Sequence, residues 1–275
     1  MLPFTASIDA IQKDFLEAGI DVSAPGFYDD AAFSERESRD PSYLNNYARF
    51  VRGRQSAPDY LEKAEQVIRV VGDILEAELV KEGRQGACVD LNMVFSRILD
   101  REGVWNHIVS GSLAVESGGD SLASFPSLDF GEFAAGHAWL YAPPFDVVDL
   151  TIRQQPYNSA RTKAILPPTI FEKSVTPFRV KPTDVCSKSV LRMTAEEGIP
   201  NDRAIFTLEP HLREFFPLFP CNMVKRERIA FRYVPVAVSA SDASLEQIVN
   251  FPMNGRFAAQ IYEELVKPVL TAQQA

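Results

Sequence analysis

Apolar residues recur at helical spacing in three stretches of the chain. The first is short, covers residues 7–16 and ends before Gly19. The second follows residues 56–59 (Ser-Ala-Pro-Asp), which are typical of a capping box, and the third runs from Cys88 to Gly103. Each stretch predicts an amphipathic helix that buries one face. The buried positions expected in the two longer helices are Leu61, Ala64, Ile68, Val71, Leu75 and Leu79, then Leu91, Val94, Phe95, Ile98 and Leu99.

Alternating or continuous apolar runs predict strands after the third helix. Residues 105–115 alternate and should form the first strand of a sheet. Residues 137–142 and 146–151 are apolar and β-prone, and Pro143-Pro144 interrupts them, so they predict a β-hairpin. Residues 229–238 predict a further strand.

The remaining segments are less regular. Residues 20–55 are polar and turn-rich, and they predict no clear element. Residues 116–135 begin with Glu-Ser-Gly-Gly-Asp and predict a loop, which either lies over a site or crosses the molecule without order. Nine prolines break residues 152–222 into short pieces, which predicts an irregular layer with one or two short helices. Residues 255–266 predict a closing helix that the next proline should end.

Composition narrows the class of protein. With 275 residues and 46% hydrophobic content, we expect one large domain, or a core with an appended subdomain. The net charge of −9 argues against binding to nucleic acid or to an anionic membrane surface. Three cysteines without short paired spacing indicate neither a disulfide framework nor a zinc site, and three scattered histidines indicate no metal site. Without a signal peptide pattern or a membrane-length apolar run, the expectation is a cytoplasmic protein.

Cys88 is distinguished by its place at a helix start. It directly follows the loop Gly-Arg-Gln-Gly-Ala at residues 83–87. The unpaired N–H groups and the positive dipole end of a helix favour a thiolate over a thiol. The same N–H groups can hold an oxyanion, with the Cys88 amide as the expected donor. A buried structural cysteine is the alternative that this position alone leaves open.

The predicted hairpin places a carboxylate beside a histidine. If the loop is residues 143–145, then Trp139 faces Asp149. His137 shares a face with Trp139, so Asp149 becomes its diagonal neighbour, at roughly 7–8 Å between Cα atoms. If the loop has four residues, the parity changes and Asp146 lies on the histidine's face instead. Asp146 adjoins the turn and suits a turn role, which favours Asp149.

Cys88, His137 and Asp149 together predict a site for acyl transfer through a cysteine nucleophile. The thiolate attacks, the imidazole takes and returns the proton, and the carboxylate fixes the imidazole's tautomer. Most chains of this size contain the three residue types in this order, so the local context of each residue carries the prediction. Gln85, in the loop before the cysteine, and Trp139, on the histidine's strand, are candidate oxyanion or site-supporting residues.

These segments resemble the bacterial transglutaminase-like core, a superfamily related to papain-like proteases. The similarity covers about residues 60–152, and four pieces in order are more specific than any one of them. The chain departs from the family's pattern at Leu150, which replaces the usual proline, in a shorter His-to-Asp spacing, and in a long insertion over residues 112–135. The matching pieces are a G-x-C-x-[DE] helix start at 86–90, a G-V…V-S-G strand at 103–111, His-Ala-Trp at 137–139 and Val-Asp-Leu-Thr at 148–151.

This resemblance implies an α+β fold: a papain-like, transglutaminase-like core with an N-terminal helical layer packed on an antiparallel sheet. Residues 1–55 would form a helical or irregular extension, residues 56–152 the catalytic core, and residues 153–275 the part that completes the same domain. It implies a cysteine hydrolase or acyltransferase with a Cys-His-Asp triad and no cofactor. The expected substrate is a peptide, a protein side-chain amide or a small amide.

A second resemblance is to arylamine N-acetyltransferases, which have a similar chain length and the same three residue types. Residues 84–95 look like their R-G-G-x-C-x-E-x-N-x-L-F signature. Gln85 replaces a glycine of that signature and Asp90 replaces its glutamate, and the later strands look less like that family. An acetyl-CoA-dependent acetyltransferase is therefore the alternative activity. A catalytically inactive binding module of the same fold is the third alternative.

Overall fold

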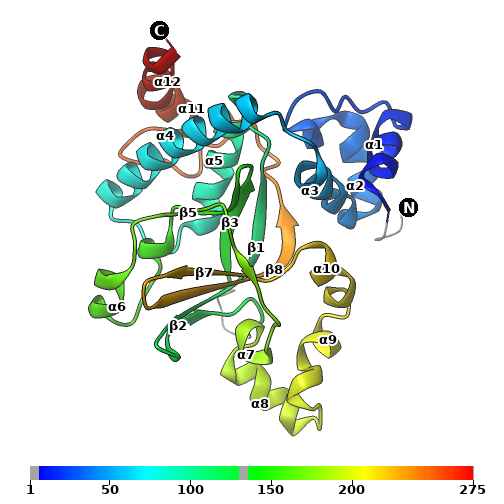
Figure 1. The fold of residues 1–275 in the computed structure, drawn as a ribbon, viewed down its shortest axis with the longest axis vertical. Coiled ribbons are helices and arrows are strands. Elements are labelled where there is room, and N and C mark those ends of the chain that lie inside the picture. The colour runs from blue at the N-terminus through cyan, green and yellow to red at the C-terminus, as the bar shows by residue number, and fades with distance from the viewer. Residues whose placement is uncertain (1–5, 130–135, 275) are drawn as a thin grey trace.

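An antiparallel sheet runs through the centre of the computed structural model, which describes residues 6–129 and 136–274 (Figure 1). The strand order is β5-β4-β3-β1-β8-β7-β6, and β2 pairs with β1 beside this path. Helices and an antiparallel sheet together confirm the expected α+β class. The strands are β1 (His107–Ser117), β2 (Asp120–Phe125), β3 (His137–Ala142), β4 (Phe145–Asp149), β5 (Ile170–Glu172), β6 (Thr176–Pro177), β7 (Asn222–Arg226) and β8 (Ile229–Ser239).

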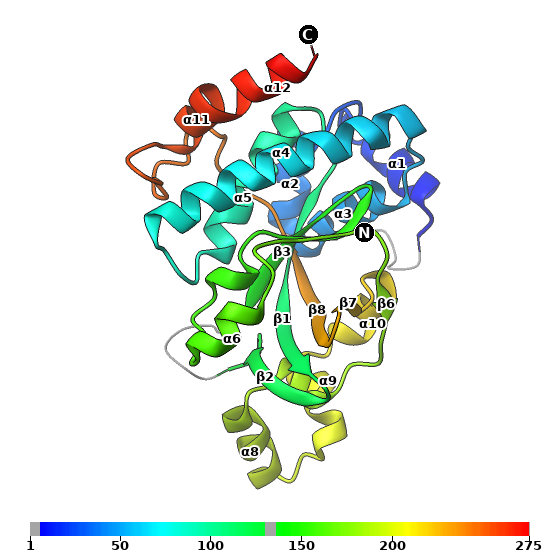
Figure 2. The same cartoon turned by 60° about the vertical axis from the view of Figure 1, so that its left-hand side comes forward.

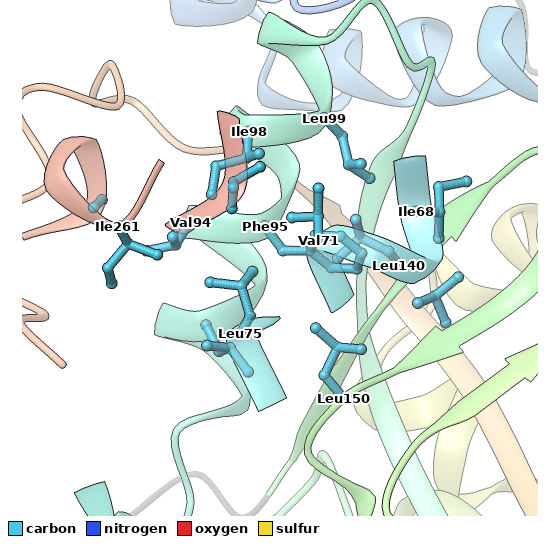
Figure 3. Close-up of a cluster of buried hydrophobic side chains, with 14 of the residues drawn as sticks. Ile68, Val71, Leu75, Val94, Phe95, Ile98, Leu99, Leu140, Leu150 and Ile261 are labelled. Carbon is cyan, nitrogen blue, oxygen red and sulfur yellow. The ribbon is translucent and has the colours of Figure 1, made fainter. Parts of the chain in front are cut away.

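Two long helices, α4 (Pro58–Glu82) and α5 (Cys88–Arg101), pack together on the sheet (Figures 1 and 2). Their apolar faces, as the helical spacing predicts, meet strand β3 in a fully buried cluster (Figure 3). Burying side chains of this size contributes roughly 1.5–3 kcal/mol each, so the cluster holds α5 and its first residue firmly against the sheet. The labelled members are Ile68, Val71, Leu75, Val94, Phe95, Ile98, Leu99, Leu140, Leu150 and Ile261.

The capping box expected at residues 56–59 does not form. The residue before α4 is Ala57, whose side chain cannot cap, and Pro58 occupies the first helical position. Ser56 lies one residue too early to reach the helix N–H groups, and its hydroxyl accepts a hydrogen bond from Arg54 Nη1 at 3.4 Å. The capping serine that the sequence pattern predicts therefore lies one residue before the position from which it could cap α4.

Residues 20–55 are more ordered than their polar composition predicts. With α1 (Ile8–Glu17) they form a helical layer that contains α2 (Ala31–Arg39) and α3 (Leu44–Gly53). Edge-to-face aromatic contacts hold the layer together, with ring centroids mostly 5–6 Å apart. Trp105, just before β1, packs into the same cluster and joins the layer to the sheet. The buried rings are Phe15, Phe27, Tyr28, Phe33, Tyr43, Tyr47, Phe50 and Trp105.

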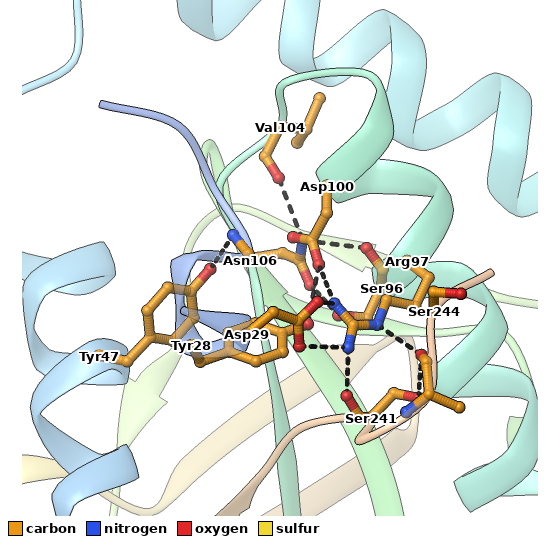
Figure 4. A network of polar contacts seen from close by, with 12 residues as sticks. Tyr28, Asp29, Tyr47, Ser96, Arg97, Asp100, Val104, Asn106, Ser241 and Ser244 are labelled. Carbon is orange, nitrogen blue, oxygen red and sulfur yellow. Dashed lines mark hydrogen bonds and ion pairs between the residues drawn. The ribbon is translucent and has the colours of Figure 1, made fainter. Parts of the chain in front are cut away.

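An ion pair between the buried Arg97 and the exposed Asp29 also ties this layer to α5 (Figure 4). The Arg97 guanidinium donates to both carboxylate oxygens of Asp29, at 2.6 and 2.7 Å, and to the Ala243 carbonyl at 2.9 Å. Tyr28 donates to Asp100 at 2.8 Å, and burial raises the pKa of Asp100 to about 7. Because the fork of Arg97 is fully engaged, three segments distant in sequence are held in one geometry.

Residues 116–135 contain a strand where a loop was expected. Residues Gly118 and Gly119 form a two-residue turn with positive φ, and β2 folds back on β1 so that Ser117 pairs with Asp120. A Gly-Gly pair is suited to such hairpin turns, and the run of polar residues around it obscured the strand. Residues 130–135 of the expected loop lie outside the described part of the chain.

The segment after the hairpin holds more helices than the one or two expected. Its prolines do not prevent short helices: Pro182 begins α7, and Pro217 lies inside α10. The closing helix also continues past Pro268, because the π-helix η5 (Tyr262–Val266) widens the backbone just before it. The helices are α6 (Ala160–Ile165), α7 (Pro182–Val185), α8 (Lys188–Glu196), α9 (Ala204–Leu208), α10 (Leu212–Leu218), α11 (Ala258–Ile261) and α12 (Lys267–Gln274).

Within residues 6–129 and 136–274, no helix has the length and apolar character needed to cross a membrane.

The sheet draws its strands from both halves of the chain: β8 pairs with β1 along almost its whole length, and β5 pairs with β4. The segment after residue 152 therefore contributes β5, β6, β7 and β8 to the same sheet as the predicted site.

Candidate active site

The start of α5 places Cys88 beside strand β3. Gly86 has φ +69°, a conformation that favours glycine, and its N–H donates to the Gln154 carbonyl at 2.9 Å. The side-chain amide of Asn92 donates to the carbonyls of Cys88, at 2.8 Å, and Ala138, at 2.9 Å. Asn92 thus clamps the first turn of the helix to the strand that carries His137, and Cys88 is only 5% exposed.

The hairpin brings Asp149 to His137 by a route that differs from the predicted one. The turn consists of Pro143 and Pro144 alone, so Ala142 pairs with Phe145 and the three-residue loop is wrong. A register shift between residues 140 and 142 then adds the missing residue, and Leu140 pairs with Val148. Continued by one residue, this register sets Trp139 opposite Asp149, as predicted. The Asp149 carboxylate lies 2.7 Å from His137 Nε2.

Asp149 is completely buried and accepts every hydrogen bond that it makes. Its Oδ1 accepts from the Thr151 N–H at 2.9 Å and from the Thr151 hydroxyl at 3.1 Å. Its Oδ2 accepts from the Tyr233 hydroxyl at 2.9 Å as well as from His137. Burial alone would raise the pKa of Asp149, but the charge and hydrogen bond of His137, with the bonds from Thr151 and Tyr233, lower it. The group is a carboxylate near neutral pH.

His137 and Cys88 shift each other's pKa in the directions that favour a thiolate–imidazolium ion pair. Burial opposes protonation of His137, but Asp149 and the thiol outweigh it and raise the pKa of the imidazole to about 10. Burial likewise opposes ionisation of Cys88, but the interaction with His137 and the Ala138 N–H lower the pKa of the thiol. Nδ1 of His137 makes no regular hydrogen bond with a described residue. Such contacts are often loose in the absence of substrate.

The other titratable residues of these types lack this environment. Burial raises the pKa of Cys186 to about 11 and that of Cys221 to about 12. His211 is exposed near Glu209. His107 is buried, with its pKa lowered to about 3 by burial and by Arg52. Among the described cysteines, only Cys88 therefore has a depressed pKa.

The two tentative supporting residues have different positions. Trp139 is buried, and its ring is nearly parallel to that of His137 (centroids 6.2 Å apart, planes at 22°). It also contacts the Tyr233 ring, with centroids 5.0 Å apart, so Trp139 packs against both aromatic partners of Asp149. Gln85 is exposed, and the structure does not bring it to the cavity beside Cys88. The glutamine that lines this cavity is Gln155.

Gln155 and Tyr233 are site residues that the sequence did not reveal. Gln155 is buried, lines the cavity and donates from Nε2 to the Thr151 carbonyl at 3.2 Å. Tyr233 lies on β8, which is far from Asp149 in sequence. In the sheet, only β1 separates β8 from β3, the strand that pairs with Asp149's own strand β4. The only sequence signal for Gln155 was its closeness to Asp149 along the chain. Tyr233 had no such signal, because a local sequence pattern does not determine the order of strands in a sheet.

A cavity of about 600 Å³ opens beside Cys88 and His137, within the size range of small-molecule sites. Its walls come from the start of α5, the middle of β1, the end of β2, and the bulged part of β8. A substrate in this cavity would meet the thiol directly.

Comparison of the chain with protein-family models, with curated proteins and with solved structures finds no significant match. The function therefore has to be inferred from the arrangement of the residues themselves.

Proposed function

We propose that this protein is an acyl-transfer enzyme in which Cys88 forms a thioester with its substrate. The observation that carries the proposal is the buried His137–Asp149 pair, with 2.7 Å between the ring and the carboxylate, in the wall of the same cavity as the Cys88 thiol, whose pKa the imidazole lowers. A structural cysteine has no need of a depressed pKa or of an imidazole held by a buried carboxylate. Both features are what a nucleophile needs.

The first half-reaction would use the ion pair directly. The thiolate of Cys88 attacks the carbonyl carbon of an amide or thioester, and a carbon–sulfur bond forms. The tetrahedral oxyanion collapses, the bond to the leaving nitrogen or sulfur breaks, and the imidazolium of His137 gives its proton to that atom. Asp149 keeps the ring oriented and stabilises its charged form before and after this step.

The second half-reaction reverses the roles. A water or an amine enters, neutral His137 takes its proton as it attacks the thioester carbon, and the carbon–sulfur bond breaks. The product is a carboxylic acid with water and an amide with an amine. The thiolate–imidazolium pair is regenerated without any oxidant or cofactor.

Two groups would stabilise the oxyanion in this reaction. The first N–H groups of α5 have no acceptor within the helix, because the hydrogen-bond ladder begins a turn later. Gln155 can add its second amide hydrogen, since its side-chain amide donates to one described group, the Thr151 carbonyl. Donors of this kind stabilise charge that develops only during the reaction.

The proposal predicts selective alkylation of Cys88. With iodoacetamide, Cys88 should react fastest and should stay reactive below pH 7, because its thiolate is stabilised by His137. Cys186 and Cys221, whose raised pKa values keep them as thiols, should react slowly until strongly alkaline pH or unfolding. Mass spectrometry of digests from a pH series measures the three rates.

The variant His137→Ala is the control for the cause of this reactivity. It should slow alkylation of Cys88 near neutral pH while leaving the other two cysteines unchanged. Equal rates at Cys186 or Cys221 and at Cys88 near pH 7 would show that the thiol of Cys88 is not activated, and the proposal would fail.

A further inference from the structure

We infer that the cavity beside Cys88 selects donors whose acyl group is uncharged and largely apolar. This inference rests on the proposed function and names the substrate class of the same site. The juxtaposition that carries it is the Cys88–His137 pair at one end of a cavity whose other described walls hold only apolar and neutral polar side chains.

The apolar part of the wall is built by specific backbone features. Val89, next to the nucleophile, is 46% exposed and lies at the cavity. Val236 is the extra residue of a bulge in β8, because Ser110 pairs with Ala237 while Gly111 pairs with Pro235. Bulges beside sites re-aim side chains, and Val236 lines the cavity as a result. Phe125 and Pro156 complete the apolar surface.

Small residues give this cavity its depth. Gly111 lies in the middle of β1, where a Cβ atom would stand 2.0 Å from the Val234 carbonyl oxygen. Gly136 lies opposite, where a Cβ would stand 3.1 Å from the Gly111 carbonyl oxygen. Both glycines line the cavity, so no side chain from these two positions takes up the space next to His137.

Apart from Cys88 and His137, the polar groups of the described wall are neutral. Ser112 donates its hydroxyl hydrogen to Ser127 Oγ at 2.8 Å and accepts the Ser127 N–H. The hydroxyl hydrogen of Ser127 therefore remains available to an acceptor on a substrate. Gln155 contributes an amide, and the Ser110 hydroxyl bonds to that of Ser239. Such groups orient a carbonyl or an ether oxygen but do not neutralise a charge.

Charged side chains close to the cavity are engaged elsewhere. Arg84, in the loop before Cys88, donates to the Pro252 carbonyl at 3.1 Å and lies over the Phe251 ring. Arg232 forms a two-bond pair with Asp184 at the neighbouring cavity, at 3.0 and 2.7 Å. Within the described residues, no lysine, arginine, aspartate or glutamate lines the cavity at Cys88.

The charge of the site itself disfavours an anionic acyl group. The thiolate and the Asp149 carboxylate are two negative groups against one positive group, the His137 imidazolium. An acyl carboxylate would enter a half-enclosed space with a net negative centre and, among the described lining residues, no cationic group besides His137, at the cost of its hydration. A neutral chain meets no such cost and gains from contact with Val89 and Val236.

Two five-carbon donors test the inference: the pentanoyl and glutaryl thioesters of one small neutral thiol. They have equal chain length and the same leaving group, and they differ in a terminal methyl against a terminal carboxylate. Intact-protein mass spectrometry follows acylation of Cys88, with the uncatalysed rates subtracted. Pentanoyl transfer should be faster by on the order of 10-fold or more, since an uncompensated charge near a like charge costs at least about that factor.

Lysine substitutions in the cavity wall test whether this wall determines the preference between the two donors. Val89→Lys and Val236→Lys each add an ammonium at the cavity and should reduce the pentanoyl-to-glutaryl rate ratio at least several-fold. The ratio cancels any effect on the thiol itself, because both donors meet the same nucleophile. Val80→Lys is the matched control: Val80 is 48% exposed, like Val89, but lies on α4 away from the cavity, and its ratio should not change.

The outcomes separate the inference from the function on which it rests. Acylation of Cys88 by neither thioester would overturn the proposed function. Equal rates with both donors would overturn the inference and leave the function standing. A preference for pentanoyl that survives in both cavity variants would also overturn it, because the selecting group would then lie outside this cavity.

Discussion

Replacing Asp149 with asparagine is expected to lower turnover at least about 10²-fold while the protein remains folded. All four bonds to this carboxylate come from donors: His137, Tyr233 and the N–H and hydroxyl of Thr151. Whichever way an asparagine amide is turned, its NH₂ group faces one of these donors. The ring of His137 then loses either its orientation or the charge that raises its pKa, and the thiolate loses its partner.

Asp146→Asn is the matched control for this change. Asp146 lies on the same strand three residues earlier, so its side chain points to the other face, and it is half-buried beyond the reach of His137. Steady-state turnover, with circular dichroism to verify folding, should show the large loss in Asp149→Asn only. Damage by Asp146→Asn with a mild effect of Asp149→Asn would contradict the triad.

The free energy of unfolding should fall in mildly acidic solution because of His107. This ring is buried, stacks on Tyr141 at 5.2 Å and makes no regular hydrogen bond with a described residue. Burial and the nearby Arg52 lower its pKa to about 3, against 6.5 when exposed. The neutral ring is therefore compatible with the fold above pH 6.5, and its contribution is lost progressively as the pH falls toward 3.

At pH 5 this one group should cost about 2 kcal/mol relative to pH 7.5. Chemical denaturation of the wild type and of His107→Phe at both pH values measures the difference. Because phenylalanine keeps a ring against Tyr141 but cannot be protonated, that variant should lose less stability on acidification. The other titratable groups contribute equally to the pH dependence of both proteins, so their effect cancels in the comparison. A parallel loss in the two proteins would assign the acid sensitivity to other residues.

The long periodic elements could be predicted from the sequence because local pattern and tertiary packing agree there. The helices at residues 58–82 and 88–101 bury the faces that their spacing indicates, except that Leu61, near the start of the first helix, is only half-buried. The buried rings of residues 20–55 were missed because they are separated by polar and turn-forming residues, so they show no single period. They become a cluster only when three short helices fold together around Trp105.

The contact between Asp149 and His137 could be predicted only in part from the sequence. The parity of the two strands was predicted correctly, although the turn was taken as one residue too long. A register shift inside the hairpin compensates for the shorter turn, and no local signal announces such an irregularity. Tyr233 and Gln155 were beyond prediction for a related reason: each is brought to the site by the order of strands and loops in space.

The most direct test of the proposed function is to isolate the acyl-enzyme. The wild-type protein is mixed with a neutral thioester donor, stopped with acid within the first turnovers, and digested for mass spectrometry. We expect a mass increase of one acyl group on the peptide that contains Cys88, removable by neutral hydroxylamine and absent in Cys88→Ala. An acyl group on Cys186, on Cys221 or on no cysteine would contradict the assignment of Cys88 as the nucleophile.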